Sequence, residues 1–110
     1  IKAYIRPALA DHVIDQIENA SANSPGIAQS EVRIYGHPAD SDPLERSHLT
    51  KLEIVVRDED VDGIIDVILG HAQTGRSGDG AIYISPVSDA IRVRNGERGQ
   101  DAVHSVFGEA

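Results

Sequence analysis

The chain has 110 residues, 40% of them hydrophobic, and 18 acidic against 10 basic side chains give it a formal net charge of −8. A chain of this length buries roughly two-thirds of its unfolded surface, enough for one core, so we expect a single domain over residues 1–110 and no multidomain enzyme. The absence of cysteine excludes disulfides, thiol catalysis and Cys-ligated metal sites.

The charge and hydropathy patterns also restrict location and partners. The acidic balance argues against nucleic acid and anionic membrane surfaces as nonspecific partners. No apolar run approaches the ~20 residues that span a bilayer, so we expect no membrane insertion. The expected compartment is the cytoplasm.

The first half of the chain contains two predicted strands around one predicted helix. Residues 1–6 alternate apolar and polar side chains and predict a strand, which Pro7 ends. An apolar stripe from Leu9 to Ala20 predicts a helix. Residues 31–35 predict the second strand, and residues 37–43 have the composition of a loop.

The second half repeats the order strand, helix, strand. Residues 51–57 predict a third strand, which we expect to pair antiparallel with the second across the loop. Acidic residues 58–60 precede the clearest helical pattern, at 61–69, where they complement the exposed N–H groups of a helix start. After a glycine-rich loop, residues 81–85 predict a fourth strand.

The order β-α-β-β-α-β is that of the ferredoxin-like α+β sandwich. We expect in addition a short C-terminal strand at 91–94 and a tail at 101–110. Two helices should cover one face of the sheet. Since only 4% of residues are aromatic, little bulk is left for the other face, which favours an oligomer that shares its sheets.

The loop at 74–80 is the first candidate for chemistry. Its glycines, at 75, 78 and 80, leave backbone N–H groups able to line a concavity for an anion such as phosphate. The loop is not a P-loop, because no Lys-Ser/Thr follows, and not a dinucleotide fingerprint, because it precedes a strand. A glycine-rich turn alone is more often only a turn, so a structural role stays open.

A pair of arginines shifts the balance towards an anion site. Arg92 and Arg94 stand two residues apart on a predicted strand, so both guanidinium groups would project from one face and form a clamp for phosphate. The alternative is a solvated edge on which Glu97 or Asp89 neutralises them. Together with the glycine loop, the pair favours anion binding.

No catalytic or metal site is visible. The spacing of the histidines is not typical of metal ligands, so we expect isolated surface histidines and no protein-held metal; they are His12, His37, His48, His71 and His104. No serine has the context of a nucleophile elbow. We therefore expect no catalytic residue and a protein that is not an enzyme.

Two stretches carry a family resemblance: TGRSGDGAIYI from Thr74 and AIRVRNGERG from Ala90. They resemble the C-terminal signature of the PII nitrogen-regulatory signalling proteins, and the likeness covers residues 1–101. The resemblance implies a ferredoxin-like protomer, a homotrimer and adenine nucleotide, not covalently held, in the clefts between subunits.

The resemblance also implies roles for seven nucleotide-binding residues. The backbone of Gly78, Asp79 and Gly80 would hold phosphates, and Arg92 and Arg94 would reach them across the interface. The backbone of Val55 would meet adenine, and Gly36 would enter the target-binding T-loop.

The departures from the family pattern are specific. The T-loop, residues 37–50, is shorter and has no tyrosine, so uridylylation of the usual kind is not available. His37 and Pro38 replace an Arg-Gln pair, which argues against sensing of 2-oxoglutarate. Ala81 replaces a lysine that contacts the outer phosphates, which should weaken ATP more than ADP or AMP.

These features resemble PII-like proteins with shortened T-loops found beside carboxysome or bicarbonate-transport genes. We therefore expect a regulator that prefers ADP or AMP to ATP, senses bicarbonate, and acts on a transporter or enzyme through residues 37–50. The alternatives are a nitrogen-regulatory PII paralogue that senses ATP and ADP, a weak nucleotide hydrolase, and a structural oligomer whose arginines bridge subunits.

Overall fold

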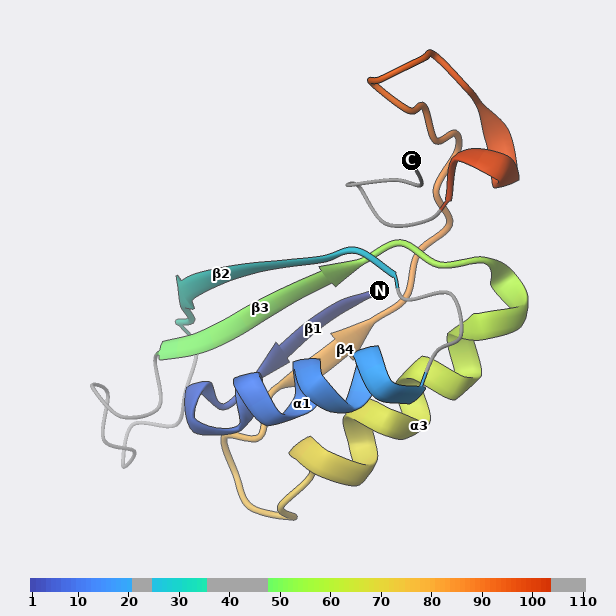
Figure 1. Cartoon of the computed structure of the whole chain (residues 1–110). Helices are drawn as coiled ribbons and strands as arrows, with labels where there is room; N and C mark the ends of the chain where they lie inside the picture. Colours follow the sequence, from blue (N-terminus) through green and yellow to red (C-terminus); the bar gives the residue numbers. More distant parts are fainter. Residues whose placement is uncertain (21–24, 36–47, 104–110) are drawn as a thin grey trace.

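The computed structural model describes residues 1–20, 25–35 and 48–103 (Figure 1). Its strands and α-helices are β1 (Lys2–Ile5), α1 (Pro7–Ala20), β2 (Ile27–Arg33), β3 (His48–Ile54), α3 (Val61–Ala72) and β4 (Ala81–Tyr83). Short 3₁₀ helices cover Asp58–Asp60, directly before α3, and Gly99–Ala102.

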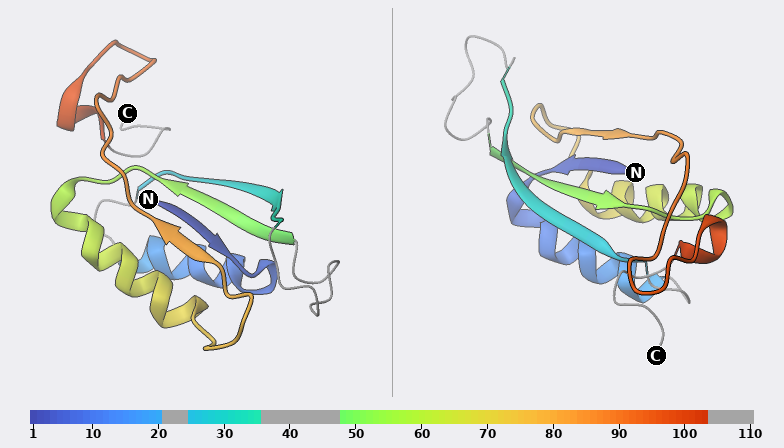
Figure 2. Two further views of the ribbon diagram at one scale, coloured as in Figure 1. Left: turned by 180° about the vertical axis from the view of Figure 1, so that it is seen from behind. Right: turned by 90° about the horizontal axis from the view of Figure 1, so that it is seen from above.

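The strands form one antiparallel sheet in the order β2-β3-β1-β4. Both helices lie on the same face of this sheet, as the two views of Figure 2 show. Element order and strand order together are those of the ferredoxin-like sandwich. The predicted α+β fold is therefore confirmed.

The core lies between the sheet and the two helices. Each helix buries residues three or four positions apart, as expected for a helix with one apolar face: α1 buries Ala10, Val13 and Ile17, and α3 buries Ile64, Ile68 and Ala72. The sheet contributes Ala3, Ile5, Leu52 and Ile54. Two members of the predicted stripes are exposed: Ala20 at the end of α1, and Leu69, whose exposed fraction is 44%.

The helix-free face of the sheet carries side chains from β1, β3 and β4. Lys51 and Glu53 form an ion pair at 2.9 Å, and the Lys51 ammonium lies 5.9 Å from the centre of the Tyr4 ring. Tyr4 in turn meets Tyr83 edge to face, with ring centres 5.8 Å apart. Tyr83 remains 61% exposed, so this face offers aromatic surface that the protomer itself does not cover.

Two predicted strands are displaced by two to four residues at their ends, and pairing explains both displacements. The second strand is Ile27–Arg33 rather than 31–35, because its whole length pairs with β3 despite weak strand formers at its start. The third strand is His48–Ile54 rather than 51–57. The ladders end where Ile54 donates to the Ile1 carbonyl, so Val55 and the next residues have no strand partner.

The C-terminal strand expected at 91–94 is reduced to a single bridge between Ile91 and Arg98. A turn occupies residues 93–95. The argument that strand alternation places Arg92 and Arg94 on one face is therefore wrong. The fourth strand is also shorter than expected, since Tyr83 pairs with Lys2, the first residue of β1.

Candidate functional site

The glycine loop, residues 74–80, connects α3 to β4 and is organised around Asp79. The Asp79 carboxylate accepts hydrogen bonds from the backbone N–H of Thr74 at 2.8 Å and of Gly75 at 2.9 Å. It also accepts from the Thr74 hydroxyl and, at 2.9 Å, from Arg6 Nε. The side chain of Asp79 thus faces the interior of the loop and fixes its shape.

Arg6 ties this loop to the end of β1. Its Nη2 donates to the Ser77 carbonyl at 2.9 Å, while its Nε binds Asp79. Residue spacing could not reveal this role, because 73 residues separate Arg6 from Asp79. Arg6 and Thr74 are the positioning residues that sequence reasoning missed.

These hydrogen bonds lower the pKa of Asp79 well below its usual value of 3.8, with the Thr74 hydroxyl as the largest cause and Arg6 next. A depressed folded pKa means that the unfolded chain binds more protons. The contribution of Asp79 to stability is therefore complete above about pH 4 and is lost as the pH falls further.

We accordingly expect Asp79→Asn to flatten the acid dependence of stability. The free energy of unfolding of the wild type, measured by urea titration from pH 5 to pH 2, should fall more steeply than that of the variant. Thr74→Val removes one donor and should give an intermediate slope. Parallel curves for the wild type and Asp79→Asn would contradict the assignment.

Gly80 ends the loop where it meets β1. Its φ is +100°, and a Cβ atom built on it would lie 1.8 Å from the Tyr4 carbonyl oxygen. Gly78, with φ of +96°, also adopts a conformation that L side chains rarely take. The loop backbone that was predicted to hold phosphate therefore depends on glycine at these positions.

The second predicted group, Val55, Arg92 and Arg94, lines one pocket of about 350 Å³. Val55 directly follows β3, Arg92 directly precedes the turn at residues 93–95, and Arg94 lies within that turn, which we call the arginine turn. Backbone hydrogen bonds hold this turn: Arg92 donates to the Glu97 carbonyl, and Gly96 donates to the Arg92 carbonyl, each at 2.7 Å. The structure brings these three predicted residues together.

Asp89, named above as one candidate partner for the arginine pair, binds Arg98. Two nitrogens of the Arg98 guanidinium donate to the same carboxylate oxygen, which lowers the pKa of Asp89. The contact links the segment after β4 to the start of the Gly99–Ala102 helix. It therefore shapes the base of the arginine turn.

The glycine loop and the arginine turn lie at opposite ends of the sheet. Figure 1 shows them leaving the two ends of β4, and Ala81 pairs with Tyr4 while Tyr83 pairs with Lys2. β1 has 4 residues, a length of about 13 Å. The predicted binding residues thus form two separate groups within one protomer, and Gly36 lies outside the described residues.

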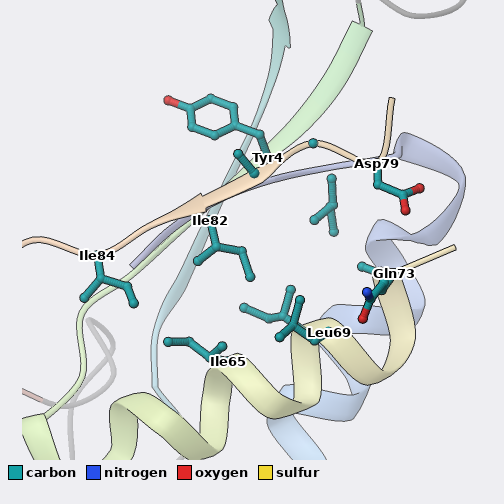
Figure 3. Close-up of a pocket in the computed structure, with 12 residues that line it drawn as sticks. Tyr4, Ile65, Leu69, Gln73, Asp79, Ile82 and Ile84 are labelled. Carbon is teal, nitrogen blue, oxygen red and sulfur yellow. The ribbon is translucent and has the colours of Figure 1, made fainter. Parts of the chain in front are cut away.

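An apolar groove of about 470 Å³ runs between β4 and α3 (Figure 3). Ile65 and Leu69 form its helical wall, and Ile82 and Ile84 form its strand wall. Asp79 and Gly80 close the end next to the loop. The walls are aliphatic, so the groove itself has few groups that could orient a phosphate.

The expectation of isolated histidines is wrong for one pair. His12 Nε2 and His71 Nδ1 are 3.0 Å apart, with ring centres at 4.8 Å. Sequence spacing could not reveal this contact, because it joins α1 to α3 across 59 residues. Within the residues that the structure describes, no three His, Cys, Asp or Glu side chains cluster as metal ligands.

None of the helices in the described part of the chain is long and apolar enough to cross a bilayer.

Comparison with known proteins identifies the family. The family model described as Nitrogen regulatory protein P-II matches residues 1–97. Nitrogen regulatory protein P-II 2 of Methanothermobacter thermautotrophicus is 40% identical over 111 residues, covering 94% of this chain and 95% of the relative. Nitrogen regulatory protein P-II of Nostoc punctiforme is also 40% identical, with coverages of 94% and 97%.

A solved structure gives the same result. The crystal structure of Arabidopsis thaliana PII bound to citrate matches with a TM-score of 0.76 and 38% identity, over 92% of this chain and 87% of the other. Sequence and fold therefore agree with the resemblance seen in the two C-terminal stretches. The chain belongs to the nitrogen regulatory protein P-II family of regulatory signalling proteins.

Proposed function

We propose that this protein is a nonenzymatic sensor that binds adenine nucleotide in the clefts between the subunits of a homotrimer. Each cleft combines the glycine loop of one protomer with Val55, Arg92 and Arg94 of the next. Nucleotide occupancy changes the loop that begins at Gly36 and so regulates a transporter or an enzyme. Differential binding of the ligand to two states of that loop is the mechanism.

One observation carries this proposal: the two predicted anion-binding groups lie at opposite ends of the protomer's sheet. A phosphate chain held by backbone N–H groups at one end cannot also reach the arginines at the other end of the same chain. A second copy that presents its arginine turn to the glycine loop completes the site.

Exposed apolar residues support association between copies. Val87, Ile91 and Val93 are all more than half exposed, and they lie on the segment that carries the arginines. Exposed apolar residues gathered in this way are typical of a surface that binds another protein. The uncovered aromatic side chains of the helix-free face support the same conclusion.

The ligand preference follows from Ala81. This residue begins β4 directly after the glycine loop. The family resemblance implies a lysine at this position. Without that charge the outermost phosphate loses a partner, so we propose that ADP or AMP binds better than ATP.

The second effector is proposed to be bicarbonate, bound between the arginines and the terminal phosphate of the nucleotide. A guanidinium pair suits a small planar oxyanion. The Arabidopsis relative was crystallised with citrate, itself a small carboxylate anion, which supports an anion as a ligand here.

Ala81→Lys tests the preference directly. We expect the added ammonium to raise the affinity for ATP by about tenfold relative to AMP, since AMP has no outer phosphate for it to contact. Calorimetric titration of the wild type and of Ala81→Lys, each with ATP and with AMP, gives the ratio of the two affinities. Ala81→Gln, of similar length but uncharged, should leave the ratio near the wild-type value; an equal gain for both nucleotides would contradict the role of this position.

The nucleotide assignment is tested by titrating the protein with ATP, ADP and AMP, each with and without bicarbonate. Tighter binding of ADP or AMP, coupled to bicarbonate, supports the inorganic-carbon sensor. ATP binding that tightens with Mg²⁺ and 2-oxoglutarate supports the alternative, a nitrogen-regulatory paralogue. The absence of saturable nucleotide binding would leave the structural oligomer in which arginines bridge subunits.

A weak nucleotide hydrolase is the remaining alternative, and phosphate release separates it from a sensor. In the described part of the chain, no three His, Cys, Asp or Glu side chains gather as ligands for a catalytic metal. We therefore expect no phosphate release above the uncatalysed rate. Release that disappears in the Arg92→Ala variant would favour the hydrolase.

A further inference from the structure

His12 and His71 form a contact that the nucleotide sensor does not use. His12 stands on α1 and His71 in the last turn of α3, and these two helices lie side by side on the sheet (Figure 2). The His12 Nε2 atom faces the His71 Nδ1 atom at 3.0 Å, and the ring planes cross at 77°. Two ring nitrogens from different helices therefore lie within contact distance of each other.

Such a pair can form a hydrogen bond between its two rings or bind one metal ion between them. With suitable tautomers, one ring donates its N–H to the lone pair of the other, and the contact is a hydrogen bond. With both facing nitrogens unprotonated, the two lone pairs converge and can share one cation. Neutral imidazole is the most common metal ligand in proteins.

We propose that His12 and His71 chelate a divalent first-row transition metal ion, with Cu²⁺ bound most tightly. Metal–imidazole bonds are about 2.0–2.1 Å long, so neighbouring ligands at right angles lie about 2.9 Å apart and tetrahedral ligands about 3.3 Å. The observed 3.0 Å fits the right-angled arrangement of a tetragonal site. That geometry suits Cu²⁺ and Ni²⁺, and Cu²⁺ has the higher affinity for a given set of ligands.

The surroundings define the kind of site. His12 is exposed and His71 partly exposed, so the ion reaches both nitrogens from solvent. In the described residues no third His, Cys, Asp or Glu side chain joins the pair. Water completes the coordination, and the site is therefore open and exchangeable rather than a closed structural centre. The net charge of −8 raises the local concentration of cations.

An ion held in this way connects α1 to α3. Because the two histidines are 59 residues apart in the sequence, the unfolded chain does not hold them together. The ion therefore binds the folded state in preference and raises the temperature of unfolding.

The test is a titration of the full, tag-free protein with CuCl₂ in a buffer that does not bind copper. We expect one tight ion per protomer, and a loss of affinity of about tenfold or more in His12→Ala and in His71→Ala, since each variant loses the chelate effect. His48→Ala, which removes a histidine of β3, is the matched control and should keep the wild-type affinity.

Two further measurements separate a metal site from a hydrogen bond. His71→Asn keeps a side chain that can hydrogen-bond His12 but offers no imidazole, so it should lose the tight ion and the copper-induced rise in unfolding temperature. Electron paramagnetic resonance should show two coupled nitrogens in the wild type and one in His71→Asn. Equal copper affinity in the wild type and His71→Asn, or an equal loss in His48→Ala, would overturn the proposal.

Discussion

Gly80→Ala is expected to destabilise the fold by about 2–4 kcal/mol, because the new methyl group would meet main chain rather than a movable side chain. At φ of +100°, its Cβ would lie 1.8 Å from the Tyr4 carbonyl oxygen and 2.8 Å from the Tyr4 carbonyl carbon. Either the loop leaves β1 or the start of the β1–β4 pairing opens. Urea unfolding followed by circular dichroism measures the loss.

Gly75→Ala is the matched control in the same loop. Gly75 also has a positive φ, of +79°, but a Cβ there would meet nothing within 4 Å. We expect a cost of about 1–2 kcal/mol from the left-handed backbone alone. Equal losses in the two variants would show that the approach to Tyr4 is not what requires glycine at position 80.

The other large effect is expected when two inactive variants are mixed. The Arg92→Ala/Arg94→Ala variant removes both guanidinium groups and should bind ADP about 100-fold more weakly. Gly78→Asp puts a carboxylate on the glycine loop, at a residue with φ of +96°, and should also abolish binding. If a site takes its loop from one copy and its arginines from another, co-refolded mixed oligomers regain intact sites.

Random assembly of an equal mixture should restore about a quarter of the wild-type number of sites. A site is intact only when the copy that supplies its glycine loop has the wild-type loop and the copy that supplies its arginines has both arginines. Calorimetric stoichiometry gives this number. Each variant alone must have the wild-type elution volume in size-exclusion chromatography, which is the control for assembly. No recovery in mixed oligomers of correct size would contradict a site shared between copies.

The helices and the order of strands and helices along the chain could be predicted from the sequence because they depend on patterns within each segment. The apolar spacing at 61–69 is complete without reference to any other element, and α3 covers it. Strand ends could not be predicted in the same way. Val55 and Val56 have side chains that favour strands, yet they lie outside β3 because no neighbouring strand continues beside them.

The candidate site likewise combines features that could be predicted from the sequence with contacts that could not. The positive φ values at Gly78 and Gly80 are a local requirement of the loop backbone, so the sequence indicated the loop, whereas the approach of Gly80 to the Tyr4 carbonyl could not be predicted. The contacts of Arg6 with Asp79 and of His12 with His71 join residues 73 and 59 positions apart. Only the packed sheet and helices bring these side chains together, and the spacing of residues contains no sign of it.

The anchoring of the glycine loop by Arg6 also bears on the order of folding. The contact closes a separation of 73 residues, and closing so long a segment costs chain entropy that β1–β4 pairing must offset. The loop cannot take its final shape before β1 and β4 are paired. A copy whose first strand has come loose also releases the loop, and ligand binding at that loop would therefore report the integrity of the whole sheet.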